Sequence, residues 1–399
     1  MFFYALGRVV PMDAHTPRST LPMHPFTIIY KFGFLRGSVV KSFSMVIAGS
    51  SRRTTYRAPQ PCYNRLMMNL SLMQAFFRTV DEDGYTPLIQ PLLAHWPHDP
   101  NSARVLRASS NFILRYTCQG QPHILRLTPA GQRTPALLQA EMDFLLHLTG
   151  QGLPVNRPLA SINGNWIESA ITPLGLLHAV SLEYLAGEEM EFETLTLPDF
   201  SHWGQALGEL HNAAAGFTAP ARPDWRELLR AAMDRLPADE FTARRAGETL
   251  QARLGRLPVS RENYGLIHDD FELDNLLWLE GCPQIIDFDD CIHHWLAADV
   301  AYALRDLFED RWSRLDLTHP ALLAFTTGYR RARPLAESEL ANLPLFMALL
   351  NFLMFAELLA IVREPPAGGE PDWTTNLRQR LAVKLETYRE ELAAFVASN

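Results

Sequence analysis

Apolar and polar positions alternate in short runs over residues 102–128, and the segment CQGQP supplies a turn between two of these runs. This pattern predicts a hairpin or a small antiparallel sheet. Residues 134–150 then place apolar side chains at three- and four-residue spacing and end in glycine, which is typical of an amphipathic helix. Residues 158–170 and 176–185 again have the pattern of strands. The first part of the chain is therefore expected to be rich in sheet.

The pattern changes after the acidic segment AGEEMEFE, which we interpret as a hinge. Helical spacing dominates the rest of the chain, over residues 200–214, 225–236, 240–257, 298–312, 320–332, 345–362 and 373–396. The segment 345–362 is apolar and about as long as a membrane span. Asn351 and Glu357 interrupt it, and aromatic or basic anchors do not flank both ends. We therefore expect a buried helix in a large helical lobe.

Length and composition agree with two lobes. The 399 residues are 47% hydrophobic and 20% charged, enough apolar material for a large core. The net charge of -8 argues against a protein that binds nucleic acid through a basic surface. Four cysteines stand far apart without a CxxC pair, which favours a reducing, cytoplasmic compartment and no structural zinc.

Residues 1–66 differ from the rest of the sequence. They hold nine Lys and Arg against one acid, Asp13, and lack a sustained periodicity. Such a segment either precedes a later biological start at Met67, Met68 or Met73, directs the protein to a compartment, or is an accessory piece. We expect it to lie outside the fold, followed by a nucleotide-binding lobe at 67–185 and a catalytic lobe at 186–399.

The densest chemistry lies in residues 264–290, YGLIHDDFELDNLLWLEGCPQIIDFDD. Two strand-like runs, 276–279 and 284–286, are separated by the turn EGCP, and acids cluster on either side. Clustered like charges repel, so a cation is the expected neutraliser. Asp270, Asn275 and Asp287 offer hard oxygen ligands, which suits Mg²⁺ bound jointly with substrate phosphates.

The same residues carry a family resemblance. His268, Asp270 and Asn275 form HxDxxxxN, and Asp287 opens DFD after a strand. From about residue 88 onward the chain resembles the aminoglycoside phosphotransferase and choline kinase group of the protein-kinase-like superfamily. The resemblance implies an α+β, bilobal protein-kinase-like fold, with a small antiparallel-sheet N-lobe and a larger, mainly helical C-lobe.

The resemblance also implies roles in phosphoryl transfer, where positioning and charge neutralisation dominate catalysis. Asp270 matches the catalytic aspartate that accepts the proton of the attacking hydroxyl, and His268 supports its loop. Asn275 and Asp287 match the ligands that hold Mg²⁺ against ATP. Asp299 resembles a later aspartate that braces the loop.

On the nucleotide side, kinases use a strand cation tied to a helix glutamate. No lysine lies between Lys41 and Lys384. Arg126 in HILRLT is the best match for this cation and Glu141 for its partner, with Arg115 as the competitor, because a guanidinium can grip two phosphate oxygens.

Two main-chain segments are further candidates for nucleotide contacts. Ser110 and Asn111 occupy the position of the family's phosphate-covering turn, although an ordinary turn fits equally well. Glu183 and Leu185 lie in the segment that resembles the adenine-binding hinge.

Several residues depart from the family pattern. Asp269 stands where glycine is usual, and Asp289 extends the acidic run. Glu272, Asp274 and Asp289 are candidates for acceptor binding; the added acids could instead bind a second metal or remain solvated. The adjacent His293 and His294 make a weak zinc ligand set.

These observations predict an ATP-dependent kinase that phosphorylates a hydroxyl of a small molecule. The acids favour an amine-bearing acceptor such as an aminoglycoside, choline or a homoserine-like compound, and we expect neither nucleic acid nor a membrane as partner. One alternative is a protein Ser/Thr kinase of the stress-response type, against which the lack of an APE-type segment counts. The other is a nucleotide-binding pseudokinase, against which the intact Asp270, Asn275 and Asp287 count.

Overall fold

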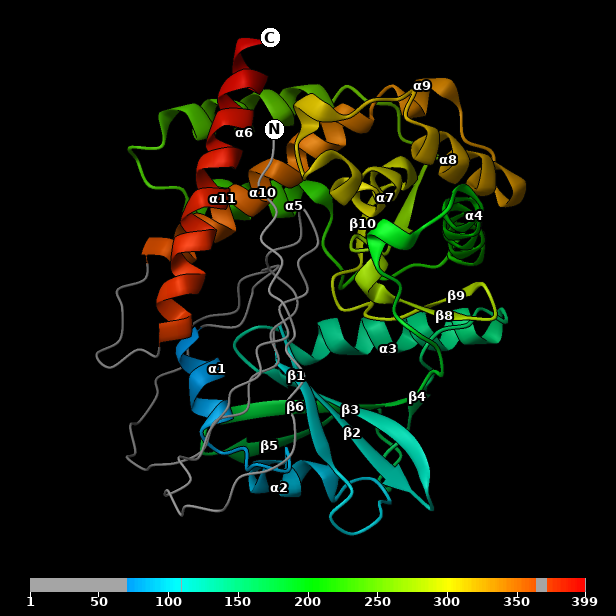
Figure 1. The fold of residues 1–399 in the computed structure, drawn as a ribbon, viewed down its shortest axis with the longest axis vertical. Coiled ribbons are helices and arrows are strands. Elements are labelled where there is room, and N and C mark those ends of the chain that lie inside the picture. The colour runs from blue at the N-terminus through cyan, green and yellow to red at the C-terminus, as the bar shows by residue number, and fades with distance from the viewer. Residues whose placement is uncertain (1–69, 109, 364–371, 399) are drawn as a thin grey trace, which may run out of the picture.

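The computed structural model describes residues 70–108, 110–363 and 372–398. The predicted basic extension 1–66 and Ser109 of the predicted phosphate-covering turn therefore lie outside the described residues. The described chain forms a small lobe built on a sheet and a larger helical lobe (Figure 1).

The small lobe is a six-stranded antiparallel sheet in the order β1-β2-β3-β6-β4, with β5 also paired to β6. Alternation along β2 buries Phe112 and Leu114 on one face and exposes Arg115. Gln119 and Gly120 form the predicted turn between β2 and β3 with φ of 52° and 77°, the left-handed geometry of two-residue hairpins. The strands are β1 (Arg104–Ala108), β2 (Phe112–Cys118), β3 (Gln121–Pro129), β4 (Pro158–Leu159), β5 (Glu168–Thr172) and β6 (Gly175–Glu183).

The predicted amphipathic helix is α3 (Pro135–Gly150), which lies between the sheet and the large lobe (Figure 1). The Thr134 side chain accepts a hydrogen bond from the Leu137 N–H and caps the helix start. Two further helices, α1 (Leu70–Phe77) and α2 (Gln90–Leu93), complete the small lobe. Phe76 of α1 stacks on Phe112 of the sheet with ring centroids 3.8 Å apart, so α1 is part of this core.

The large lobe is built around α10 (Leu343–Arg363), the long apolar segment of the sequence. Its length and composition would allow it to cross a membrane, but 78% of its most apolar window is buried inside the protein. It contacts α5, α6, α7 and α11, so it is the buried core helix that the sequence predicted. The other helices are α4 (Leu197–Ala213), α5 (Trp225–Arg235), α6 (Phe241–Leu254), α7 (Leu296–Ala303), α8 (Pro320–Ala332), α9 (Glu337–Leu340) and α11 (Asp372–Ala397).

Two glycines bring α4 and α8 unusually close together. A Cβ added at Gly204 would lie 1.9 Å from the Phe325 carbonyl oxygen, and one added at Gly328 would lie 1.8 Å from the Ser201 oxygen. Only a residue without a side chain fits at either position. This close approach lets His211 of α4 and Tyr329 of α8 meet, with His211 Nδ1 2.8 Å from the Tyr329 hydroxyl.

Four short strands hold the chemistry-bearing segment. The predicted hairpin is β8 (Leu276–Leu279) with β9 (Cys282–Ile285). The sequence did not predict the second pair, β7 (Tyr264–Ile267) with β10 (Ile292–Trp295), which encloses it.

The predicted helix over residues 298–312 is wrong in its bounds. α7 ends at Ala303, a 3₁₀ turn follows at Arg305–Phe308, and Glu309 and Asp310 adopt φ of 54° and 55°. A helix cannot continue through two left-handed residues. The turn directs Arg305 toward the acids of the catalytic segment.

Candidate active site

The loop after β7 carries the first predicted catalytic residues. Asp269 has φ of 69°, a left-handed conformation that explains why glycine is usual at this position. The Asp299 carboxylate accepts hydrogen bonds from the N–H groups of His268 at 2.8 Å and Asp269 at 2.7 Å. His268 Nε2 lies 3.0 Å from the Ile286 carbonyl oxygen, so its ring links this loop to the end of the β8–β9 hairpin.

Asn275 orients the buried carboxylate of Asp270. Its Nδ2 donates to the Asp270 backbone oxygen and to Asp270 Oδ2, both at 2.8 Å. The other end of the same amide, Asn275 Oδ1, is buried and has no hydrogen-bond partner among the described residues. An unsatisfied buried acceptor costs free energy, so this oxygen is available for a ligand.

Asp287 follows the hairpin with φ of 67°. Arg107 of β1 lies 3.2 Å from Asp287 Oδ2, which links the sheet of the small lobe to this loop. The Asp287 carboxylate therefore lies where the small lobe meets the catalytic segment.

The oxygen ligands fit a magnesium ion. Asn275 Oδ1 is a buried oxygen without a hydrogen-bond partner in the described part of the chain, and Asp287 supplies a charged oxygen. Both are donor types that Mg²⁺ prefers. Within the part of the chain that the structure describes, no group of three or more His, Cys, Asp or Glu side chains could hold a metal ion by itself. Mg²⁺ usually takes only one or two protein carboxylates together with water and substrate phosphates, so this donor set fits an ion shared with a nucleotide.

Arg126 of β3 and Glu141 of α3 form a buried bidentate pair, with both nitrogen–oxygen distances at 2.6 Å. Burial opposes the charge on Arg126, but Glu141, Asp289 and Asp287 outweigh it and raise the pKa of the guanidinium. The charges of the DFD segment thus act directly on Arg126. The competing Arg115 is exposed.

Asn111 is engaged within the protein. Its Nδ2 donates to Asp289 Oδ2 at 2.7 Å, and its Oδ1 accepts from Thr128 Oγ1 at 2.7 Å. Its side chain therefore joins the small lobe to the DFD segment, whereas the side chain of Ser110 makes no hydrogen bond within the described residues.

The predicted hinge lies at the end of β6. The Glu183 carbonyl oxygen accepts from Asn156 Nδ2 at 2.9 Å, and its N–H donates to the Arg157 oxygen. The Leu185 N–H has no backbone partner within the described residues. This group is therefore a free main-chain donor at the hinge.

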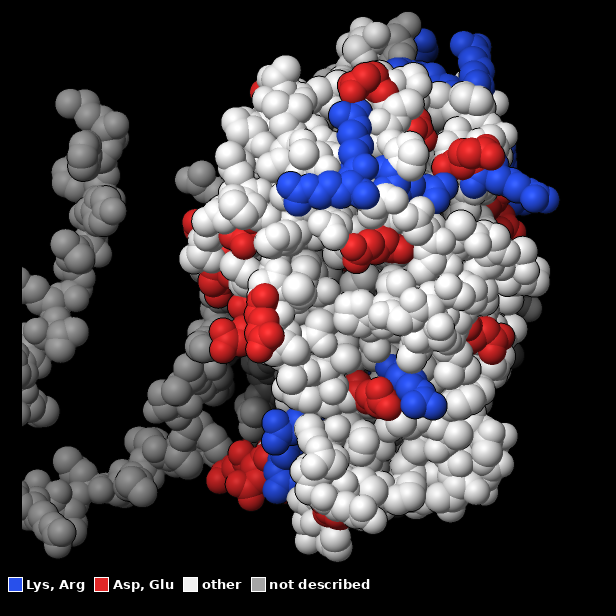
Figure 2. Space-filling model, turned by 90° about the vertical axis from the view of Figure 1, so that its right-hand side faces the viewer, with Lys and Arg blue, Asp and Glu red and all other residues white. Residues whose placement is uncertain are grey.

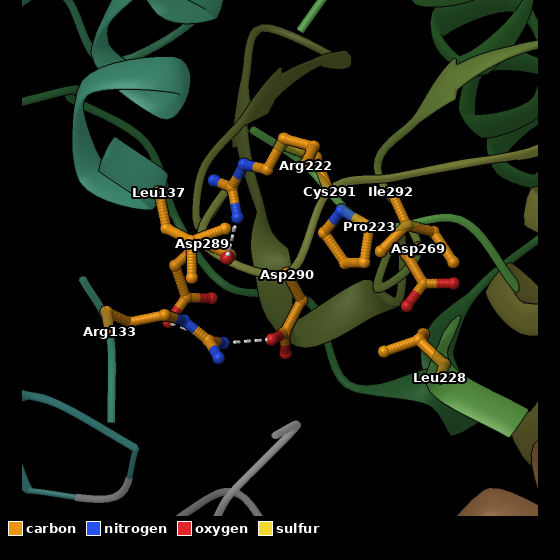
Figure 3. Close-up of a pocket in the computed structure, with 10 residues that line it drawn as sticks. All are labelled: Arg133, Leu137, Arg222, Pro223, Leu228, Asp269, Asp289, Asp290, Cys291 and Ile292. Atoms are coloured by element: carbon orange, nitrogen blue, oxygen red, sulfur yellow. Dashed lines mark hydrogen bonds and ion pairs between the residues drawn. The ribbon is translucent and has the colours of Figure 1, made fainter. Parts of the chain in front are cut away.

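A pocket between the lobes is lined by the remaining acids of this segment (Figure 3). Arg133 forms ion pairs with Asp290 and, at 3.9 Å, with Asp289. Arg222 donates to the Asp289 backbone oxygen at 2.7 Å and lies 3.7 Å from Glu141. Burial raises the pKa of the neighbouring Cys291 thiol to about 12, which keeps it protonated at neutral pH.

Arg305 is the main residue that sequence reasoning missed. Its guanidinium forms an ion pair with Glu272 and lies 3.6 Å from Asp270 Oδ1 and from Asp310 Oδ1. Burial opposes its charge, but Glu272 and Asp310 raise its pKa. Lys384 of α11 binds the other oxygen of Asp310 at 2.8 Å. The available signal was the single basic residue of the run AADVAYALRDL.

The structure separates the three predicted acceptor-binding acids. Glu272 is 2% exposed and paired with Arg305, and Asp289 is held by Asn111 on the side of the small lobe. Asp274 is half-buried, and burial together with the Glu272 charge raises its pKa. Asp274 is therefore the member of this set with the least compensated charge.

The adjacent histidines point to different partners. His293 Nε2 lies 3.0 Å from the Ala219 oxygen, whereas His294 Nδ1 accepts from the Trp295 N–H at 2.8 Å. They pack within the lobe and do not form a joint ligand pair.

The two lobes, the braced loop and the acidic segment between them define a protein of the kinase-like fold. The sequence model of the phosphotransferase enzyme family matches residues 103–335. The chain belongs to this family and is a phosphotransferase that acts on small molecules.

Individual relatives support this assignment. The chain is 26% identical to amicoumacin kinase from Bacillus subtilis (strain 168), over 66% of this chain and 82% of that protein. It is 32% identical to homoserine kinase from Mesorhizobium japonicum, over 59% of this chain and 72% of that protein. Among solved structures, amicoumacin kinase hAmiN in complex with AMP-PNP, Ca²⁺ and Ami has a TM-score of 0.64 at 22% identity, covering 79% of this chain and 96% of that chain. A microcompartment-associated aminopropanol kinase has a TM-score of 0.57 at 23% identity, covering 77% and 97%.

Proposed function

We propose that this phosphotransferase moves the γ-phosphate of ATP to a hydroxyl of an amine-bearing small molecule, with Asp270 as the base. The observation that carries the proposal is the Asn275 amide. Its nitrogen fixes the Asp270 carboxylate at 2.8 Å, while its oxygen is buried and has no hydrogen-bond partner among the residues that the structure describes. The Asn275 side chain thus orients the base, Asp270, and also offers an oxygen ligand to the cation that binds with the nucleotide.

Asp270 is placed to accept the proton of the attacking hydroxyl. Its Oδ2 is held by Asn275, and Arg305 lies 3.6 Å from its Oδ1. A nearby guanidinium favours the ionised carboxylate, the form that accepts a proton. The Asp299 carboxylate fixes this loop by accepting hydrogen bonds from the N–H groups of His268 and Asp269.

Arg126 orients the phosphates from the small lobe. Glu141 holds its guanidinium by two hydrogen bonds, which restricts it to one direction. Asn275 and Asp287 would hold Mg²⁺, which supplies positive charge against the phosphates when bound. Leu185 offers its free N–H to the adenine edge at the hinge.

The charges beside Asp270 favour an amine on the acceptor. Asp274 and Asp306 have raised pKa values because burial and neighbouring acids disfavour their ionised forms. An ammonium group near them would relieve this repulsion. Amicoumacin kinase, homoserine kinase and aminopropanol kinase, the relatives named above, have names consistent with such acceptors. A chain that uses ATP in this way is assigned to the cytoplasm.

The test is acceptor-dependent ADP release from Mg-ATP. We would compare amino alcohols, homoserine and aminoglycosides with matched alcohols that lack the amine. The proposal expects release with at least one amine-bearing acceptor, weaker release with its matched alcohol, and loss of release in Asp270→Asn. Binding of Mg-ATP without release on any acceptor would contradict it and favour a nucleotide-binding regulator. Transfer to a protein Ser/Thr instead would favour a protein kinase.

A further inference from the structure

A second pocket lies in the large lobe, on the far side of Asp299 from the catalytic loop. It has a volume of about 340 Å³ and is formed by the end of α4, the loop that follows it, the approach to β7 and the end of α8. Its walls include His211, Phe217, Arg261, Tyr264, Leu296 and Arg333. Pockets of this size can enclose a small organic ligand. None of the residues assigned above to ATP, to the metal or to the acceptor lines it.

The charge of this pocket is positive. Arg261 is exposed and Arg333 is half-buried, and neither forms an ion pair with a carboxylate in residues 70–108, 110–363 and 372–398. The pKa of the neighbouring Glu262 is lowered first by a hydrogen bond with Ser260 and also by both guanidinium charges, but Glu262 does not pair with either. Two cations at one pocket without ion-pair partners favour an anionic ligand.

Arg333 keeps N–H donors that could bind an anionic ligand in this pocket. Arg333 donates from Nη1 to Asn212 Oδ1 at 3.0 Å and from Nη2 to the Glu262 backbone oxygen at 2.7 Å. A guanidinium carries five N–H donors, so these two bonds position Arg333 and leave the others available. Figure 2 shows Lys and Arg side chains, with Asp and Glu side chains among them, over the upper part of the face that carries α4 and α8.

The rest of the pocket is apolar. Phe217, Leu296 and the small residues of the loop after α4 form its wall, so a bare inorganic ion would leave much of it unfilled. An organic phosphate satisfies both halves, because its phosphate suits guanidinium groups and its carbon skeleton suits the apolar wall.

A direct chain of contacts joins this pocket to the catalytic loop. His211 lines the pocket, and its Nε2 lies 3.1 Å from Asp299 Oδ2. The same carboxylate oxygen accepts from the His268 N–H at 2.8 Å. The His211 ring is also fixed from α8, where the Tyr329 hydroxyl lies 2.8 Å from its Nδ1. A ligand against His211 would therefore act on the residue that holds the loop of Asp270.

We propose that this pocket binds a small organic phosphate and that its occupancy changes the turnover number through His211 and Asp299. Binding of the phosphate and the arrangement of the catalytic loop are then coupled through Asp299, which both sites contact. The ligand could be the phosphorylated product of this enzyme or a phosphate ester from another reaction, and both share the chemistry that the pocket recognises.

The experiment measures binding of glycerol 3-phosphate to the full chain by calorimetry, with saturating Mg-ADP present to occupy the nucleotide site. Glycerol and inorganic phosphate serve as controls for the organic and the ionic halves of the probe. We expect saturable binding of glycerol 3-phosphate, weaker binding of inorganic phosphate and none of glycerol. Absence of saturable binding of the phosphate ester would overturn the proposal.

Three variants assign the binding to this pocket. Arg261→Glu reverses an exposed charge and is expected to weaken binding about tenfold or more, because a charge-assisted contact is lost. Ala215→Trp fills the mouth from an exposed wall position and should also abolish binding. Arg256→Glu makes the same charge change at an exposed arginine outside the pocket and should leave binding unchanged. Equal binding by Arg261→Glu and Arg256→Glu would refute the assignment.

The effect of the bound phosphate ester on turnover is measured by steady-state kinetics once an acceptor is known. Glycerol 3-phosphate should change kcat of the natural chain and leave kcat of Arg261→Glu unchanged. An equal effect on both proteins, confined to the acceptor KM, would mean product competition at the active site and would refute the coupling. The binding experiment does not require turnover, so failure of the proposed acceptor chemistry and failure of this proposal are distinguishable.

Discussion

Asn275 holds the Asp270 carboxylate through its side-chain nitrogen at 2.8 Å, and it leaves its own oxygen buried without a partner in the described chain. The two ends of one amide therefore connect the proposed base to the proposed metal site. Replacing Asn275 should therefore affect both proton transfer and the metal requirement.

Replacing Asp270 by asparagine should lower kcat/KM by roughly 10²–10⁴-fold, because a general base is removed while the shape of the site is kept. Stabilisation by Mg-ATP in a thermal-shift assay should persist, since Asp270 is not assigned to the nucleotide. Asp234→Asn, an exposed aspartate on α5, provides the matched control and should behave like the natural chain. Full activity of the Asp270 variant would exclude this residue as the base.

Replacing Asp287 by asparagine should raise the Mg²⁺ concentration needed for half-maximal activity by about 10-fold or more, because a charged ligand becomes neutral. Asp290→Asn removes a carboxylate from the same run that is paired with Arg133, and it should change the Mg²⁺ requirement less. The two magnesium titrations are compared at saturating ATP. Identical curves would count against Asp287 as a ligand.

Truncation of Arg126 to alanine should destabilise the protein by about 3 kcal/mol, because the buried Glu141 would lose its bidentate partner and keep only Arg222, at 3.7 Å. The free energy of unfolding in urea measures this loss, and the KM for ATP should rise in parallel. Arg115→Ala, on the neighbouring strand but exposed, should stay within about 0.5 kcal/mol of the natural chain. A larger effect at Arg115 would reverse the assignment.

Asp306 should make stability depend on pH. Burial and then Asp310 raise its pKa in the folded state, so the folded protein binds a proton that the unfolded chain releases. The free energy of unfolding therefore falls as pH rises from the ordinary carboxyl pKa through the folded value. Asp306→Asn should stabilise the protein at neutral pH, with a gain that disappears at acid pH.

Asp316→Asn is the control of opposite sign. Hydrogen bonds from Thr318 lower the pKa of Asp316, so its ionised form favours the folded state and the variant should show no gain at neutral pH. Urea unfolding of the three proteins across the pH range checks both expectations. A pH-independent effect of Asp306→Asn would show that its charge is not the cause.

Gly328→Ala should destabilise the protein by about 1–3 kcal/mol or more, because the new methyl group would meet the backbone of Ser201. The free energy of unfolding again measures the effect. Gly150→Ala at the end of α3 has no atom within 4 Å of the added carbon and should be neutral. Equal stability of the two variants would mean that α4 and α8 separate without cost.

Much of this fold follows from local patterns. Alternation gave the strands around the CQGQP turn, and three- and four-residue spacing gave α3, α8 and α10. The end of α7 did not follow, because the apolar spacing continues past Ala303 while the chain turns at Glu309 and Asp310. The turn goes together with the contacts of Arg305 to Glu272 and Asp270, and hydrophobic periodicity carries no information on ion pairs between residues so far apart in sequence.

In the candidate site, too, some features could be predicted from the sequence and others could not. The spacing of Asp270, Asn275 and Asp287 was readable because one short segment contains all three. The partners of Asp289 were not, because Asn111 and Arg133 come from the small lobe, more than 150 residues earlier in the chain. Carboxylates that looked equivalent in sequence thus differ by which distant cation or amide reaches them.

The contacts from Arg107 of β1 to Asp287 and from Asn111, in the turn between β1 and β2, to Asp289 both run from the small lobe to one loop. Any widening of the cleft that carries β1 and β2 away from this loop stretches both at once, together with the pair between Arg133 and Asp290. Binding of the nucleotide and release of the nucleotide product would then both require the free energy that breaks these three contacts. This requirement is separate from the chemical step.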